Sequence, residues 1–310
     1  MTFQLLDQLT LPGDPAKANE DFLAQGAGAA LVIDGATPLG DSLMPGPSDA
    51  AWIAQFGTRR LMAHLGQGDG ARKALRDALA DAQKSFEALR RHPPEEMWQT
   101  PCASMMLAVA TDIDQPPPRA RSAQEGEVAV AGPRARESRR GLEIEFLWYG
   151  DCAALVKQGD GPVTVVGETL DKRAAEAGRA RAVAQEKNLS PAAGLRRPEF
   201  IGTLRAARNR INSGTYWLFS PDVRAASHVS RRTIKAVPGA VLLLATDGFL
   251  ALASDYGAYG TDGLMAAALS KGLAALGEEL RAIEAGDIGG DKFPRFKTSD
   301  DATALLLRLD

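Results

Sequence analysis

The sequence predicts a layered α+β fold in which helices cover sheets of mainly antiparallel strands. Short runs rich in β-branched and other apolar residues occur toward both ends of the chain, and helical patterns lie between them. Neighbouring runs are joined by short turns, such as KQGDGP at 157–162. Short turns join antiparallel strands, whereas parallel strands need a long crossover. The pattern therefore favours hairpins over repeated βαβ units.

Each predicted strand is a short apolar run that ends at Gly, Asp or Pro. These runs are the segments 29–35, 104–110, 142–151, 152–159, 162–168, 240–248 and 303–309. They are too short and too closely spaced to be helices of ordinary length.

Two helices are predicted in the first third of the chain. Ser48 and Asp49 can cap a helix over 50–65, and a second helix begins near Gly70. Apolar residues of the second helix recur at intervals of three and four, which places them on one face that must be buried. This face consists of Leu75, Leu79, Ala82, Phe86 and Leu89. The runs 171–187 and 263–286 are predicted to be helical as well.

The segment from about 112 to 140 differs from its surroundings. It contains three consecutive prolines and several arginines. Such a composition is typical of a solvated loop inserted between two strands. A basic docking surface is the alternative interpretation.

Composition excludes several classes of protein. The chain has 310 residues, of which 45% are hydrophobic and 24% charged, as in globular proteins, and this length allows one large domain or two small ones. The net charge of −3 argues against a nucleic-acid partner. We expect neither export nor membrane spanning, because the first residues lack a basic region followed by an apolar run and no apolar run is long enough to span a membrane. Cys102 and Cys152 are the only cysteines, so we expect neither a disulfide framework nor a thiolate metal site. This low cysteine content predicts a cytoplasmic protein.

Acidic residues stand repeatedly where an apolar strand starts or stops. These positions are Glu20 and Asp21 after a Gly/Pro turn, Asp34 after ALVI, Asp151 after EFLWYG, Asp247 after VLLLAT, and Asp300 with Asp301 before ATALLLRL. Each has an ordinary interpretation, because Asp and Gly are favoured in turns. Strands packed side by side bring their ends to one edge, however, and carboxylates gathered there repel one another unless a cation neutralises them. Oxygen ligands of this kind suit Mg²⁺ or Mn²⁺ and require no His or Cys.

Five motifs together resemble a known family, the metal-dependent protein phosphatases of type 2C, or PPM type. They are NED at 19–21, VIDG at 32–35, WYGDCAAL at 148–155, LLLATDGF at 242–249 and SDDATALLL at 299–307. Their order and spacing agree with the family along nearly the whole chain. The resemblance implies a single domain over 1–310 with a loop insertion at about 112–140. It also implies a four-layer α/β/β/α arrangement, with a central antiparallel β-sandwich flanked by helix pairs.

The resemblance further implies a site for two divalent cations, Mg²⁺ or Mn²⁺, at one end of the sandwich. Asp34 would bridge both ions, the Gly35 carbonyl and Glu20 would bind one of them, and Asp21 would bind it or order its waters. Asp247 and Asp300 would hold the other ion. Asp151 corresponds to the family position that helps to bind a third, weaker ion. Asp34, Asp247 and Asp300 would thus act catalytically through a metal-activated water in the hydrolysis of phosphoserine and phosphothreonine monoesters.

Three positions depart from the family pattern. An Arg that pairs with the substrate phosphate in many members is replaced by Ala16, so we predict that Lys17 takes this role, as a point charge without the bidentate fork of Arg. The loop DGATPLG lacks the His that follows the DG motif in some members, and Asp301 replaces the usual Asn. We expect a monomer that acts on a phosphorylated protein, with no nucleic-acid or membrane partner.

Two other functions are consistent with the sequence, and a third is disfavoured. The chain could be a pseudophosphatase that serves as a binding or regulatory module, or a phosphatase for a small phosphorylated substrate. A haloacid-dehalogenase-type phosphatase is disfavoured, because Ala245 stands where its nucleophilic Asp is required. Arg205, Arg208 and Arg210 belong either to a solvated helix face or turn, or to a flap that meets the phosphate.

Overall fold

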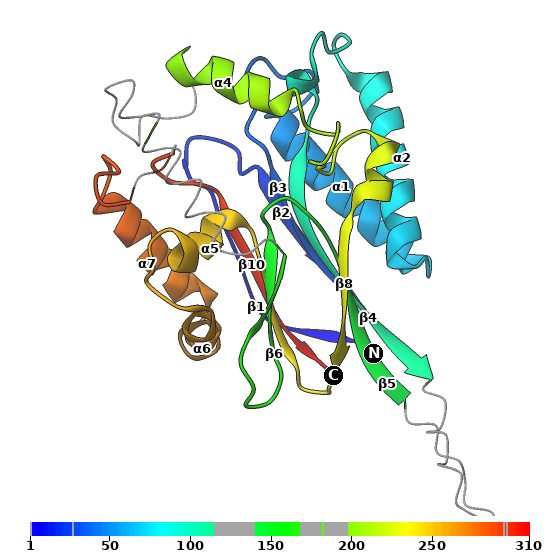
Figure 1. The fold of residues 1–310 in the computed structure, drawn as a ribbon, viewed down its shortest axis with the longest axis vertical. Helices are drawn as coiled ribbons and strands as arrows, with labels where there is room; N and C mark the ends of the chain where they lie inside the picture. Colours follow the sequence, from blue (N-terminus) through cyan, green and yellow to red (C-terminus); the bar gives the residue numbers. More distant parts are fainter. Residues whose placement is uncertain are drawn as a thin grey trace, which may run out of the picture.

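The computed structural model describes residues 2–26, 28–114, 140–167, 182, 198–293, 295 and 297–310. Within these ranges two five-stranded sheets pack against each other (Figure 1). Sheet A has the order β1-β10-β9-β6-β7, and sheet B has the order β2-β3-β4-β5-β8. All pairs of neighbouring strands in both sheets are antiparallel, as the sequence predicted.

The strands of sheet A are β1 (Phe3–Leu11), β6 (Ala153–Lys157), β7 (Thr164–Gly167), β9 (Val241–Ala245) and β10 (Ala302–Leu309). Those of sheet B are β2 (Asp21–Gln25), β3 (Ala29–Gly35), β4 (Ala103–Asp114), β5 (Arg140–Tyr149) and β8 (Ser230–Ala236). Strands such as β9 are buried along their whole length because both faces of the sheet are covered. The sequences of these strands are therefore continuous apolar runs and do not alternate between apolar and polar residues.

Helices cover the outer face of each sheet. Helices α1 (Asp49–Gly66) and α2 (Ala71–Leu89) pack on sheet B. Helices α5 (Asp247–Ser254), α6 (Thr261–Lys271) and α7 (Leu273–Ala285) pack on sheet A. A third apolar cluster fills the space between the sheets. The resulting order of helix, sheet, sheet, helix confirms the predicted four layers, and Figure 1 shows the two helical groups on opposite sides of the sandwich.

The predicted helices over 50–65, from near Gly70 and over 263–286 are confirmed with two corrections. Ser48 caps α1 by accepting a hydrogen bond from the Ala51 N–H at 3.0 Å. Leu89, predicted on the buried face of α2, is 53% exposed because it is the last residue of that helix. The run 263–286 is divided into α6 and α7 at Gly272, whose φ of 84° is incompatible with a continuous helix. Asp247, which could be interpreted as a turn residue, begins α5.

Other predictions depend on residues that the structure describes only in part. Strands β4 and β5 extend to Asp114 and from Arg140, so most of the predicted insertion lies outside the described residues, as does nearly all of the predicted helix over 171–187. Helix α4 (Pro198–Arg208) and two short 3₁₀ helices, η1 (Met97–Gln99) and η2 (Val223–His228), complete the described elements. Among the described helices, none is long and apolar enough to cross a membrane.

Candidate metal centre

The register of the two sheets gathers the acidic motifs at one end of the sandwich. In sheet B the end of β3 pairs with the starts of β2 and β4, with Asp34 opposite both Asp21 and Ser104. In sheet A the end of β9 pairs with the starts of β6 and β10, where Ala245 lies opposite Ala153 and Ala304. Motifs far apart in sequence therefore meet because antiparallel strands alternate their starts and ends along one edge.

Three of the predicted carboxylates converge most closely. Oxygen atoms of Asp34, Asp151 and Asp247 lie within 4.8 Å of one another. They come from three separate elements, since Asp34 is in β3, Asp151 follows β5 and Asp247 is the first residue of α5. All three side chains are partly buried. An oxygen-only group of this kind matches the ligand preference of hard divalent ions.

Asp21 links the two sheets at this end. It is 4% exposed, and the hydroxyl of Thr246, which precedes α5, donates to its Oδ2 at 2.7 Å. Burial raises the pKa of Asp21 well above its ordinary value, and the charge of Asp34 raises it further. The Thr246 hydrogen bond lowers this pKa, while Asp300 and Asp301 add to its rise. The carboxylates therefore repel one another, and a bound cation would relieve that repulsion.

Glu20 is held in place by the loop that follows β3. The Thr37 hydroxyl donates to Glu20 Oε2 at 2.7 Å, and the Gly35 N–H donates to the Glu20 carbonyl at 3.0 Å. Gly35 has no room for a side chain, because a Cβ there would lie 2.4 Å from the Ala50 carbonyl oxygen in the first turn of α1. The DG motif thus lets α1 approach β3 closely beside Asp34.

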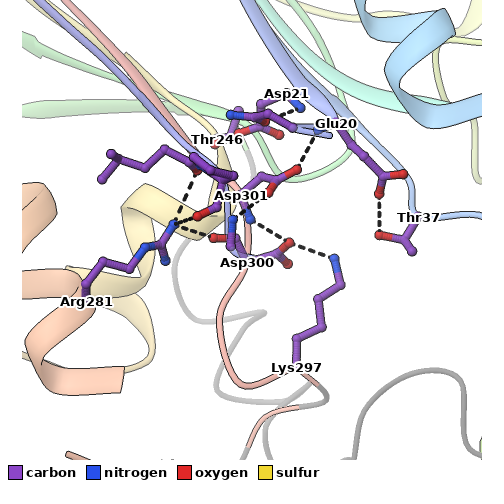
Figure 2. Close-up of polar contacts among 12 residues, drawn as sticks. Glu20, Asp21, Thr37, Thr246, Arg281, Lys297, Asp300 and Asp301 are labelled. Atoms are coloured by element: carbon purple, nitrogen blue, oxygen red, sulfur yellow. Dashed lines mark hydrogen bonds and ion pairs between the residues drawn. The ribbon is translucent and has the colours of Figure 1, made fainter. Parts of the chain in front are cut away.

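Asp300 and Asp301 have different surroundings (Figure 2). Asp301 accepts hydrogen bonds from the backbone N–H groups of Gly13 at 2.7 Å and Glu20 at 2.6 Å. It therefore fixes the loop between β1 and β2, a role that uses both carboxylate oxygens. Asp300 instead meets the ammonium of Lys297 at 2.7 Å.

Asp151 is positioned by a tight turn between β5 and β6. Gly150 has φ 63°, and a Cβ at this residue would lie 2.2 Å from Ser104 Oγ. The freed space allows the Ser104 hydroxyl to donate to Asp151 Oδ1 at 2.8 Å. Ser104 lies opposite Asp34 in the β3–β4 pair, so the hydrogen bond directs Asp151 toward Asp34.

Lys17, predicted to bind phosphate, lies in the loop between β1 and β2. Its ammonium pairs with Asp14 at 2.9 Å, and its side chain is 69% exposed. The ion pair lies in an exposed loop. Lys17 therefore contacts a residue of its own loop and not the convergent carboxylates.

Helix α4 is attached to the loop that carries Thr37. The Arg205 guanidinium lies 4.0 Å from the centre of the Trp98 ring and donates to the Leu39 carbonyl at 2.7 Å. Arg208 donates to the Thr37 carbonyl at 2.7 Å. Two of the three noted arginines thus anchor α4 beside the site, and Figure 1 shows α4 at one end of the sandwich.

A second group of possible ligands lies between α1 and α2. Atoms of His64, Asp69 and Asp77 also lie within 4.8 Å of one another. Here, however, the Lys73 ammonium donates to both Asp69 and Asp77 at 2.8 Å. Lys73 thus pairs with both carboxylates, and Arg76 Nε also lies 3.3 Å from Asp77, so two positive side chains already pair with the carboxylates of this group.

Sequence reasoning did not identify four polar residues that position the predicted ligands, namely Ser104, Thr37, Thr246 and Lys297. Thr37 and Thr246 stand within three residues of a DG motif, a position that could have drawn attention to them. Lys297 likewise stands three residues before Asp300 of the SDDATALLL motif, whereas Ser104 carries no such signal, because its role depends on cross-strand register.

Comparison with solved structures identifies the fold. The serine/threonine phosphatase PstP/Ppp of Mycobacterium tuberculosis superposes with a TM-score of 0.54 at 15% identity, with 100% of both chains covered. The PPM Ser-Thr phosphatase MsPP of Mycobacterium smegmatis, solved with cacodylate, gives 0.50 at 16% identity over 99% of each chain. PppA, a regulatory component of T6SS in Pseudomonas aeruginosa, gives 0.50 at 14% identity over 99% of this chain and 98% of that one. No protein-family model and no curated protein matches the sequence. The chain has the fold of the PPM-type serine/threonine phosphatases.

Proposed function

We propose that the chain is a metal-dependent phosphatase that hydrolyses phosphoserine and phosphothreonine monoesters. The convergence of Asp34, Asp151 and Asp247 from three separate elements carries this proposal. Their oxygen-only chemistry fits Mg²⁺ or Mn²⁺, and a cation would offset the repulsion that Asp34, Asp300 and Asp301 exert on the neighbouring Asp21. The fold shared with serine/threonine phosphatases supports the choice of substrate class.

In this proposal Glu20, Asp21, Asp34, the Gly35 carbonyl, Asp247 and Asp300 hold two divalent ions, and Asp151 assists a third. Bound ions of this kind supply an activated water and offset negative charge on the phosphoryl oxygens.

The residues around these ligands keep them in place. Thr37 orients the Glu20 carboxylate, Ser104 orients Asp151, and Asp301 fixes the backbone of Glu20. Because residues of both sheets hold these side chains, the site needs little reorganisation during the reaction. Such preorganisation of charged groups is the main source of electrostatic catalysis.

The resemblance to PPM-type phosphatases also supports a proposal for the domain organisation, the oligomeric state and the substrate. Residues 1–310 form one phosphatase domain, and the insertion predicted at about 112–140 is confined to the segment between β4, which ends at Asp114, and β5, which begins at Arg140. The protein acts as a monomer on phosphorylated protein in the cytoplasm. Its buried cysteines, Cys102 and Cys152, are core residues that take no part in the reaction.

Hydrolysis of p-nitrophenyl phosphate tests the proposal. Chelator-stripped protein is assayed with added Mn²⁺ or Mg²⁺, next to the variants Asp34→Asn and Asp247→Asn. We expect metal-dependent turnover that falls by at least about a hundredfold in both variants. Asp160→Asn is the matched control, because Asp160 is exposed in the turn beyond β6, roughly 15 Å along the strand from the site. Absence of turnover in the folded wild type with either ion would refute the proposal.

A pseudophosphatase is the second candidate, and the surroundings of Lys17 favour it. Ala16 replaces the phosphate-pairing Arg of the family pattern, and Lys17 pairs with Asp14. Such a protein would bind divalent ions and phosphorylated partners without hydrolysing them. A phosphatase for a small phosphorylated substrate would instead turn over p-nitrophenyl phosphate and leave phosphoproteins intact. Comparing the two substrates therefore separates all three functions.

A further inference from the structure

A lysine ammonium lies among the carboxylates of the proposed metal centre. Lys297 Nζ is 2.7 Å from Asp300 Oδ1, and the Lys297 side chain is 30% exposed. Figure 2 shows this side chain extending from the segment before β10 with its ammonium at the Asp300 carboxylate. Lys297 is three residues from Asp300, so the loop itself delivers the positive charge to the site.

The ammonium is surrounded by more than one negative charge. Besides Asp300, which it contacts, the Lys297 ammonium interacts electrostatically with the carboxylates of Asp34 and Glu20. These three residues come from the loop before β10, from β3 and from the loop before β2. The ammonium of a lysine carries three donors and no acceptor, so it cannot ligate a metal ion.

We propose that Lys297 is an internal counter-ion of the carboxylate site, whose ammonium a divalent ion must displace from Asp300 in order to bind there. This inference rests on the proposed function in one respect, namely that the ion binds at Asp300. The ammonium and the ion are both positive and compete for the same carboxylate. Lys297 consequently stabilises the metal-free protein and weakens metal binding.

Removing the charge of Lys297 should lower the stability of the metal-free protein and raise its affinity for the metal ion. Both effects can be measured without turnover. Lys297→Met keeps an unbranched side chain of similar length and removes the charge. Lys297→Arg keeps the charge. Lys292→Met is the control for net charge, because Lys292 is exposed and its ammonium lies 4.9 Å from the Phe293 ring centre. Each chelator-stripped protein is titrated with Mn²⁺ by calorimetry, and thermal unfolding is followed in chelator.

We expect Lys297→Met to bind Mn²⁺ at least about tenfold more tightly than the wild type, which corresponds to about 1.4 kcal/mol. We also expect it to unfold about 3 °C lower in chelator, because the carboxylates lose their counter-ion. Lys297→Arg should stay within about threefold of the wild-type affinity because it keeps the positive charge beside Asp300, and Lys292→Met should do so because it removes an exposed charge that solvent and salt screen.

Other outcomes overturn the proposal. Wild-type Mn²⁺ affinity in Lys297→Met would show that the ammonium does not compete with the ion. If that variant instead raised KM for p-nitrophenyl phosphate with unchanged Mn²⁺ affinity, Lys297 would be a phosphate-binding residue. If no protein bound Mn²⁺, the proposed function would fail, and melting in chelator would decide the counter-ion role alone, with an unchanged Lys297→Met melting temperature refuting it.

Discussion

The hydroxyl of Thr246 connects the two sheets at the carboxylate site, and its removal should destabilise the protein strongly. Thr246 is 0% exposed, donates to Asp21 Oδ2 at 2.7 Å and accepts the N–H of Thr303 at 3.0 Å. Thr246→Val has nearly the same shape, so the change isolates the two hydrogen bonds. A hydrogen bond to a charged group contributes about 1.5–3 kcal/mol, and an orphaned buried N–H costs about 1–3 kcal/mol. The effects of two neighbouring hydrogen bonds are not additive, so we expect Thr246→Val to lower the free energy of unfolding by about 3 kcal/mol.

Urea unfolding followed by the fluorescence of the four tryptophans measures this loss in chelator, where metal binding does not contribute. Thr246→Ser is the matched control, because it keeps the hydroxyl and removes one methyl group, at a cost of about 1 kcal/mol. A Thr246→Val variant as stable as Thr246→Ser would refute the assigned role of the hydroxyl.

Three further predictions concern the neighbouring loop and helix α4. Gly35→Ala should destabilise the protein by about 1–3 kcal/mol in urea unfolding, because its Cβ would collide with the Ala50 carbonyl oxygen; wild-type stability would contradict the close approach. Gly202→Ala should stabilise it by up to about 1 kcal/mol in the same assay, since Gly202 lies inside α4 with open space around it; a loss would contradict the helix there. Thr37→Val should weaken Mn²⁺ binding about tenfold in calorimetry, because the hydroxyl orients Glu20, whereas unchanged affinity would remove Thr37 from the site.

Strands were predictable from sequence where both of their faces are buried. The runs that form β9 and β10 are almost uninterrupted in apolar residues, because a sheet lies on one side and helices on the other. Edge strands β1, β2 and β8 were missed. Exposed residues interrupt the apolar pattern of β1 and β8, and β2 has only five residues, of which the first and last are polar. Helix α5 was missed because it has eight residues and starts with Asp-Gly, a pair that also favours turns.

The same contrast holds at the site. Predicted carboxylates such as Asp34 and Asp247 stand next to strand ends, so their convergence followed from packing antiparallel strands. The partners of these carboxylates did not follow from sequence. Ser104 reaches Asp151 across a strand pair, and Thr246 reaches Asp21 across the sandwich, over separations of 47 and 225 residues. Contacts of this kind depend on register and sheet stacking, which a single sequence does not specify.

An anomalous difference map from a crystal soaked in Mn²⁺ would show directly whether metal ions bind between the two sheets. We expect peaks bounded by the carboxylates of Asp34, Asp151 and Asp247, with Asp300 released from Lys297. The group of His64, Asp69 and Asp77 is the internal comparison, because Lys73 and Arg76 already pair with its carboxylates, so we expect no ion there. Peaks at that second group alone, with none between Asp34 and Asp247, would contradict the assignment of the metal centre.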